Sequence, residues 1–346
     1  MMKAAVLIAS GKIEVQDKPI PKASPDSAVV KVLETALCGS DLHYYRGHID
    51  VGKGFTMGHE FTGIITEIGS EVTGFKVGDK VVSPFTVCCM QCYYCKVGLT
   101  CRCEKSRVYG SPALEGAQAE YVDVPLADTT LFKAPDDVED ETLILMADIF
   151  PTGYYAASNA LKMMSPAEKE EVTVVVIGCG PVGFCAITSA KHFKPKRLFA
   201  IDSVPERLER AEKVHGATAL HLDEDPKAAI MKATDGRGAD VVLEIVGHAD
   251  ALRLAFDVLR PGGFIHSVGM HHSPLPIGGY EAYGKNVRMQ FGRCPVRHLF
   301  KEALEVLQEH KEDFKGFVSH RMPLTDAPKA YDLFEARKVQ KVVFTV

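Results

Sequence analysis

The residues best suited to chemistry are six cysteines within sixteen positions: Cys88, Cys89, Cys92, Cys95, Cys101 and Cys103. Four of them, Cys89, Cys92, Cys95 and Cys103, have the spacing C-x2-C-x2-C-x7-C. The short steps allow thiolates to converge on one tetrahedral zinc at roughly 2.3 Å each, and four thiolates leave no position for water. The sequence therefore predicts a structural zinc site. Cys88 or Cys101 could replace a neighbour, and Cys89 is preferred because it gives equal three-residue steps.

The alternative for this segment is a disulfide or redox loop. Whether disulfides are expected depends on the cellular compartment, because clustered cysteines in a reducing environment are more often metal ligands or catalytic groups. The N-terminal segment "MMKAAVLIASGKIEV" lacks the long apolar core and cleavage site of a secretory signal, so we expect a cytoplasmic protein. The zinc interpretation is therefore preferred.

A second, looser set of metal-type residues lies upstream, at Cys38 and His59. A catalytic zinc usually has three protein ligands and a water, so a third ligand is needed. Glu60 and Asp148 are the candidates. If "HEFTGII" is extended, residues 59 and 60 point to opposite faces. Glu60 is then predicted behind the metal, and Asp148 is predicted to complete the ligand set.

A phosphate-binding loop is predicted from "VVVIGCGPVG", which places G-x-G-x-x-G at Gly178, Gly180 and Gly183, with Pro181 and Val182 between the last two. The string follows a β-branched strand and opens a helix, which is the context that makes it specific. The glycines would permit the turn, the approach of a pyrophosphate and close packing of strand and helix. The helix N-terminus would offer amide groups to the phosphates.

Asp202 ends the next predicted strand, "RLFAID", and its charge favours NAD over NADP through the adenine ribose. Arg207 lies five residues further on. We expect it to face away from the ribose or to pair with a nearby acid, so that it does not support NADP.

The elements that must position these residues change in character along the chain. Roughly the first 145 residues contain short β-branched runs broken by glycine, as in "SAVVKVLETALCGSD" and "GIITEIGSEV". From "EVTVVVIG" onward strands and helices alternate, which predicts an α/β fold with a doubly wound parallel sheet of the Rossmann type. The last segment contains a helix, "HLFKEALEVLQEH", and ends in "KVVFTV".

The length, charge and apolar content of the chain limit the classes of binding partner to expect. The chain has 346 residues, which favours two domains, and a net charge of -5, which gives no reason to expect nucleic acid or an anionic membrane as a partner. No apolar run is long enough to span a bilayer.

Together these motifs resemble the zinc-dependent alcohol dehydrogenases of the medium-chain dehydrogenase/reductase family. The resemblance covers essentially the whole chain and rests on "CGSDLH", "GHEFTG", "CCMQCYYCKVGLTCRC", "PTGYYA" and "GCGPVG" in family order. It implies a GroES-like β-rich catalytic domain at 1–149, a Rossmann NAD-binding domain at 150–290, and a segment at 291–346 that returns to the catalytic domain. It also implies two zinc ions per chain, NAD as cofactor, and a homodimer or homotetramer.

The resemblance further implies roles for single residues. Cys38 and His59 would bind the catalytic zinc, Ser40 would accept the substrate proton, and His43 would deliver it to solvent through the cofactor ribose. Asp41 would support the zinc ligands. The positions expected at the cofactor are Thr152 and Val268 near the nicotinamide and Lys341 at the pyrophosphate. His271 and His272 follow "SVG" and are expected near the nicotinamide or at a subunit contact.

The implied reaction is reversible hydride transfer between an alcohol and NAD that gives an aldehyde or ketone. Two hints disagree about the substrate. Asp148 together with "GRCPVR" resembles the formaldehyde-dehydrogenase-like branch, whereas "CGSDLHYY" resembles polyol (sorbitol-like) dehydrogenases. A third hypothesis, from another class, is a non-catalytic structural relative, which the apparently complete zinc sites disfavour.

Overall fold

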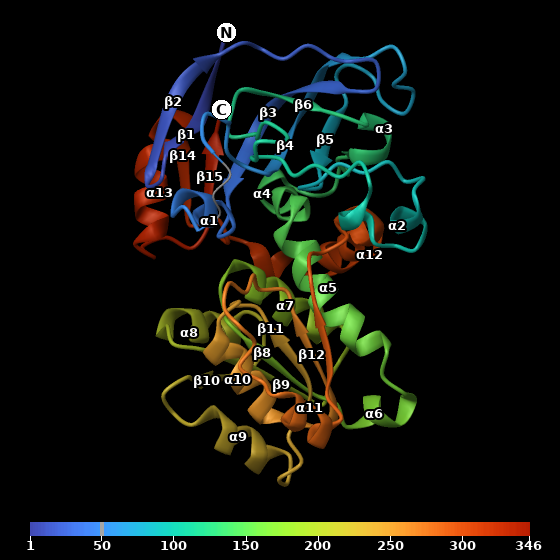
Figure 1. Ribbon diagram of the computed structural model, residues 1–346, viewed down its shortest axis with the longest axis vertical. Helices are drawn as coiled ribbons and strands as arrows, with labels where there is room; N and C mark the ends of the chain where they lie inside the picture. The colour runs from blue at the N-terminus through green and yellow to red at the C-terminus, as the bar shows by residue number, and fades with distance from the viewer. Residues whose placement is uncertain (49–51) are drawn as a thin grey trace. The chain divides into compact units, whose positions relative to one another are not determined.

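The computed structural model describes residues 1–48 and 52–346 and is drawn in Figure 1. The chain forms two units, the first from Met1–Asp148, Pro295–Leu304 and Phe314–Val346, the second from Ile149–Cys294 and Glu305–Asp313. The predicted fold class, a GroES-like part plus a Rossmann-type parallel sheet, is confirmed. The domain limits 1–149, 150–290 and 291–346 stay a prediction. In the described part of the chain, no helix is both long and apolar enough to cross a membrane.

The first unit is built on a seven-stranded sheet in the order β14-β15-β3-β4-β5-β7, with β6 paired to β3, and on a separate β1-β2 pair. Its strands are β1 (Met2–Ala9), β2 (Lys12–Lys18), β3 (Ala28–Leu37), β4 (Glu60–Ile68), β5 (Lys80–Ser83), β6 (Tyr121–Val124), β7 (Phe132–Lys133), β14 (His320–Pro323) and β15 (Val342–Thr345). Its short helices are α1 (Asp41–Tyr45), α2 (Tyr93–Lys96), η1 (Thr100–Arg102), α3 (Ala127–Thr130), α4 (Asp140–Leu143), η2 (Ile144–Ala147), η4 (Leu324–Asp326) and α13 (Ala327–Glu335).

The register of this sheet gathers residues that are distant in the sequence. On β3, Ala36 is opposite Glu60 of β4, and Leu37 is opposite Val342 of β15. The residues just beyond these pairs therefore meet at one end of the sheet. Residue 148 follows η2, whose last carbonyl, on Ala147, accepts a hydrogen bond from the backbone N–H of Phe85 at 3.0 Å.

The second unit contains a six-stranded, all-parallel sheet in the order β10-β9-β8-β11-β12-β13. The strands are β8 (Thr173–Ile177), β9 (Arg197–Asp202), β10 (Thr218–His221), β11 (Ala239–Glu244), β12 (Leu259–Ser267) and β13 (Arg288–Phe291). The helices are α5 (Ile149–Lys162), α6 (Pro166–Glu170), α7 (Pro181–His192), α8 (Pro205–Lys213), α9 (Pro226–Ala233), α10 (Ala249–Val258) and α11 (Gly279–Lys285). The strand order reverses direction between β8 and β11, which is where such sheets bind ligands.

Helices cover this sheet because its strands are apolar on both sides. All five residues of β8 are buried, as expected for a parallel strand. Helix α5 packs along α7, and α9 and α10 contribute Ile230 and Leu252 to the core under the sheet. Two elements belong to both units, namely α12 (Val296–Glu309) and η3 (Lys311–Phe314).

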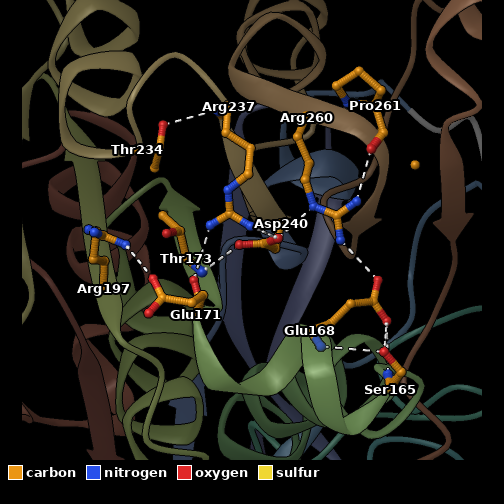
Figure 2. A network of polar contacts seen from close by, with 12 residues as sticks. Ser165, Glu168, Glu171, Thr173, Arg197, Thr234, Arg237, Asp240, Arg260 and Pro261 are labelled. Carbon is orange, nitrogen blue, oxygen red and sulfur yellow. Dashed lines mark hydrogen bonds and ion pairs between the residues drawn. The ribbon is translucent and has the colours of Figure 1, made fainter.

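At the amino end of β8 and β11 the sheet is fastened by a buried carboxylate, which Figure 2 shows between two arginines. Asp240 accepts hydrogen bonds from the backbone N–H of Thr173 at 2.7 Å, from Arg237 at 2.9 Å and from Arg260 at 2.5 Å. Arg260 also donates to Glu168 at 2.9 Å. This network is structural, since it lies at the end of the strands opposite to the glycine loop.

Candidate metal centres and cofactor site

Four cysteines of the loop meet in the structure. The Sγ atoms of Cys89, Cys92, Cys95 and Cys103 all lie within 4.8 Å of one another. Two of the sulfurs are oriented by backbone N–H groups: Gln91 and Cys92 donate to Cys89 at 3.5 and 3.4 Å, and Cys89 and Lys105 donate to Cys103 at 3.2 and 3.3 Å. Such donors stabilise thiolates. The donor set fits a closed tetrahedral zinc site.

The two remaining loop cysteines lie outside this cluster. Cys88 is buried, its Sγ lies 3.6 Å from the carbonyl of Thr129, and burial raises the pKa of its thiol to about 11. By contrast, hydrogen bonds from backbone N–H groups, that of Glu104 first, lower the pKa of Cys92 to about 6. All ten cysteines of the chain lie among the described residues and are thiols.

The second cluster joins residues from three parts of the first unit. Ligand atoms of Cys38, His59, Glu60 and Asp148 all lie within 4.8 Å of one another. Asp148 Oδ2 is 3.6 Å from Cys38 Sγ and 3.3 Å from His59 Nε2. The structure thus brings together every residue predicted for this site, although Cys38 and Asp148 are 110 positions apart.

Asp41 and Ser40 hold this cluster in place. The Asp41 carboxylate accepts from the backbone N–H of Cys38 at 3.0 Å and lies 3.0 Å from His59 Nδ1. A proton on Nδ1 leaves the lone pair of Nε2 for a metal, which is the usual arrangement of a ligating histidine. Ser40 Oγ is 3.2 Å from both Cys38 Sγ and His59 Nε2. Its hydroxyl therefore lies directly beside the ligand atoms.

Glu60 is closer to the other ligands than the sequence predicted. Because β4 begins only at Glu60, strand alternation does not separate its side chain from that of His59. Glu60 Oε2 accepts from Lys341 Nζ at 2.5 Å, while Oε1 is buried and has no hydrogen-bond partner among residues 1–48 and 52–346. A buried carboxylate oxygen without a hydrogen-bond partner is stabilised by positive charge, and a cation held by the three neighbouring ligand atoms would supply that charge.

Lys341, predicted at the pyrophosphate, has its side chain buried against Glu60. Its ammonium is 1% exposed and donates to Glu60 and to the carbonyl of Leu37, at 2.5 and 3.3 Å. Burial opposes the charge of Lys341, but Glu60, together with Cys38 and Asp148, outweighs burial and raises the pKa of Lys341. This lysine therefore neutralises Glu60 within the first unit, and its predicted contact with a pyrophosphate stays a prediction.

The donor chemistry of the second cluster fits a catalytic zinc. One sulfur, one imidazole nitrogen and one carboxylate oxygen are three of the ligand types that zinc takes, and three protein ligands leave a position open. Burial, and then the charge of Glu60, raise the pKa of the Cys38 thiol. A thiolate there consequently depends on a nearby cation.

Three other residues were predicted to act in proton transfer or cofactor binding, and the structure places them as follows. His43 lies in α1 with its ring centroid 6.0 Å from that of His48. Thr152 is half-buried in the first turn of α5. Val268 follows β12, and its backbone N–H donates to the carbonyl of Glu244 at 3.1 Å.

The glycine loop has the geometry of a phosphate-binding turn. Gly178 has a φ of +97°, which L-residues with side chains rarely adopt. A Cβ on Gly183 would lie 1.9 Å from the carbonyl oxygen of Gly178, so only glycine allows this contact. A Cβ on Gly180 would meet nothing within 4 Å, which leaves the N-terminus of α7 open. Pro181 and Val182 form the first turn of this helix.

Asp202 closes the same loop from the end of β9. Its Oδ2 accepts from the backbone N–H of Cys179 at 2.7 Å, and its Oδ1 accepts from Val204 at 2.9 Å. Arg207 Nη1 is 3.7 Å from Asp202 Oδ2. Of the two arrangements expected for this arginine, the structure shows the ion pair with an acid, and that acid is Asp202 itself.

One carboxylate near the switch point was missed in the sequence. Glu244 ends β11, is fully buried, and accepts from the backbone N–H groups of Val246 and Gly247, both at 2.8 Å. Its other oxygen lies 2.6 Å from Ser267 Oγ and 3.0 Å from His271 Nε2. The sequence feature that could have identified Glu244 is an acidic residue at the carboxyl end of a buried strand. This network also gives His271 a structural role.

Comparisons with known proteins agree with this description. Residues 24–136 match the family described as "Alcohol dehydrogenase GroES-like domain", and residues 181–309 match "Zinc-binding dehydrogenase". The chain is 51% identical over 348 residues to zinc-type alcohol dehydrogenase B of Aspergillus flavus, covering 99% of this chain and 81% of that protein. It is 52% identical over 287 residues to a medium chain reductase/dehydrogenase of Acremonium sp., covering 82% and 98% respectively.

A solved structure supports the same conclusion. The alcohol dehydrogenase TADH from Thermus sp. ATN1 superposes with a TM-score of 0.92 at 34% identity, with both chains covered completely. This similarity extends over both units and over the segments that carry the two cysteine-containing clusters. The chain therefore belongs to the zinc-dependent alcohol dehydrogenases of the medium-chain dehydrogenase/reductase family.

Proposed function

We propose that this chain is an NAD-linked alcohol dehydrogenase with two zinc ions per chain, which interconverts small or medium alcohols with their aldehydes or ketones. One observation carries the proposal: Ser40 Oγ lies 3.2 Å from both Cys38 Sγ and His59 Nε2, in a cluster that Asp148 completes. A hydroxyl beside an open three-ligand set is suited to receive a proton from a substrate held there.

In this proposal Cys38, His59 and Asp148 hold the catalytic ion, while Glu60 stays paired with Lys341. Zinc, when bound, supplies a Lewis acid that lowers the pKa of the substrate hydroxyl. The nicotinamide cofactor, when bound, supplies the hydride acceptor.

The protein's own part is to orient the reactants and move a proton. The hydroxyl of Ser40 would accept the proton of the substrate alcohol while it releases its own proton. The cofactor ribose, when bound, would link Ser40 to His43, which would release a proton to solvent. In the reverse direction the same groups return the proton to the carbonyl oxygen. Asp41 fixes the ring of His59, with its Oδ1 3.0 Å from Nδ1.

The cofactor assignment rests on Asp202 and on the loop that it closes. Its carboxylate stands where the second strand of the sheet ends, and its charge opposes the additional phosphate of NADP. Arg207 is held by Asp202 in an ion pair, which limits its capacity to bind that phosphate.

The deciding experiment measures NADH formation across primary alcohols, secondary alcohols, polyols and formaldehyde, with zinc content determined on the same preparation. Turnover of simple alcohols supports the proposal. A clear preference for sorbitol-like substrates would favour the polyol alternative, and absence of turnover with full zinc occupancy would favour a non-catalytic relative.

Two sets of variants test the roles of single residues. Ser40→Ala should lower kcat about a hundredfold, the usual range for a lost proton-transfer group, whereas Ser40→Thr should retain activity. Both variants should keep their zinc. For the cofactor, Asp202→Asn removes the charge but retains hydrogen-bonding atoms, so it should raise kcat/KM with NADP relative to NAD. A wild-type enzyme that prefers NADP would refute the placement of Asp202 at the ribose.

A further inference from the structure

A third group of metal-type side chains lies in the second unit, away from both cysteine-containing clusters in the sequence. It consists of His192, Glu309 and His310, whose ligand atoms all lie within 4.8 Å of one another. His192 is the last residue of α7, Glu309 is the last residue of α12, and His310 follows it. Two helix C-termini therefore meet here, and each contributes partial negative charge that favours a cation.

The two imidazoles share one carboxylate. His192 Nδ1 lies 2.8 Å from Glu309 Oε2, and His310 Nε2 lies 3.9 Å from Glu309 Oε1. The ring centroids of the two histidines are 6.2 Å apart with an interplanar angle of 87°. His310 Nε2 is buried and has no hydrogen-bond partner within the described ranges. A buried ring nitrogen facing a carboxylate at this distance is an unused ligand atom.

The other nitrogen of His310 faces the carboxylate of Asp313, at ion-pair rather than hydrogen-bond distance. Its Nδ1 lies 3.7 Å from Asp313 Oδ2, and Lys191 Nζ lies 3.4 Å from the same carboxylate oxygen. A carboxylate beside the second ring nitrogen typically fixes the tautomer that leaves Nε2 free to bind metal. Asp313 also balances the charge of Lys191, which would otherwise repel a cation.

Little movement is needed to close the set around an ion. Ligands about 2.1 Å from a tetrahedral metal are about 3.4 Å from each other. The observed separations of 2.8 and 3.9 Å bracket this value. The Glu309 side chain is 56% exposed and can rotate, while the His310 side chain is only 16% exposed and provides a fixed ligand.

We propose that His192, Glu309 and His310 form a third metal site, open to solvent, that binds a divalent transition-metal ion such as zinc. Two imidazoles and one carboxylate are ligands that suit zinc, nickel and copper rather than magnesium or calcium. The simpler alternative is a surface ion-pair cluster without metal. It accounts for the contact between His192 and Glu309 but leaves His310 Nε2 without a function.

The test uses the zinc-loaded full chain, dialysed to remove loosely bound metal and then titrated with Zn²⁺ in a calorimeter. We expect one additional equivalent per chain. His192→Ala, His310→Ala and Glu309→Gln should each weaken this binding at least tenfold. His320→Ala, which removes an exposed histidine of the first unit, is the matched control and should bind as the wild type does.

Melting temperatures measured without added zinc show whether each variant is folded, and Glu309→Gln alters the most exposed of the three side chains. Added zinc should raise the melting temperature of the wild type and of His320→Ala but not of the three site variants. The proposal is overturned if the wild type takes up no additional zinc, or if the folded site variants bind it as tightly as the wild type.

Discussion

Asp240 is predicted to be a major source of stability in the second unit without any part in catalysis. Its carboxylate is fully buried and receives three donors, the backbone N–H of Thr173, Arg237 and Arg260 (Figure 2). Arg260 is itself mostly buried, with 16% of its side chain exposed, and removal of Asp240 would leave it the carboxylate of Glu168 and the carbonyl of Pro261 as partners among the described residues.

The magnitude follows from the burial of each contact. Breaking a buried ion pair costs about 3–5 kcal/mol, and the retained contact of Arg260 with Glu168 places the loss near the lower limit. The side chain of Arg237 is 40% exposed, so its contact adds less than about 1 kcal/mol. We therefore expect Asp240→Ala to lower the free energy of unfolding by about 3–4 kcal/mol. Asp240→Asn should cost about 3 kcal/mol, because it also removes the charge that pairs with Arg260, and its single amide oxygen keeps only the hydrogen bond from Thr173.

The assay is urea unfolding of the zinc-loaded protein, followed by a signal of the second unit. The matched control is Asp257→Asn, which breaks a 2.7 Å pair with Arg253 whose side chains are 29% and 36% exposed. That pair should contribute less than about 1 kcal/mol. Since β8 is five residues long, Asp240 lies about 16 Å from the glycine loop, and kcat/KM should be unchanged. Equal losses for Asp240→Asn and Asp257→Asn would refute the reasoning.

Three further predictions concern other buried groups. Cys95→Ser should cost one zinc per chain and destabilise the loop, whereas Cys88→Ser should retain the full metal content; equal metal content in both would contradict the assigned ligands. Lys341→Met should lower the free energy of unfolding by about 3–5 kcal/mol, and adding Glu60→Gln should recover much of it, so additive losses in a double-mutant cycle would argue against the pair. Burial lowers the pKa of His215 from 6.5 to about 3. Between these two pH values the unfolded chain binds a proton that the folded state does not bind, so stability is lost as pH falls from 6.5 towards 3. His215→Leu should reduce the loss between pH 7 and 4.5 by roughly 2–3 kcal/mol, and an unchanged pH dependence of unfolding would exclude this.

Features that depend on short-range spacing could be predicted from the sequence. The glycines of 178–183 follow a strand and open a helix, and their geometry in the structure is what the pattern predicted: a left-handed Gly178 and a Gly183 without room for a Cβ. The steps between Cys89, Cys92 and Cys95 are equally local. In such segments the side chains that interact are neighbours along the chain, so their spacing already fixes which can meet.

Contacts between distant segments could not be predicted in this way, because they depend on how the whole chain packs. Cys103 joins the cysteine cluster and Cys101 does not, because the turn at Thr100–Arg102 directs them differently. Spacing alone left that choice open.

The cluster of Cys38, His59, Glu60 and Asp148 and the contact of Lys341 with Glu60 depend on the tertiary structure in the same way. The register of β15, β3 and β4 places Leu37 beside Val342 and Ala36 beside Glu60, and therefore brings Lys341 next to Glu60. Likewise, β4 begins at Glu60 itself, which cancels the alternation expected from an extended segment. The sequence identified the ligand types, but which atoms face each other depends on strand register and on the residue at which each strand begins, and both are set by packing across the whole sheet.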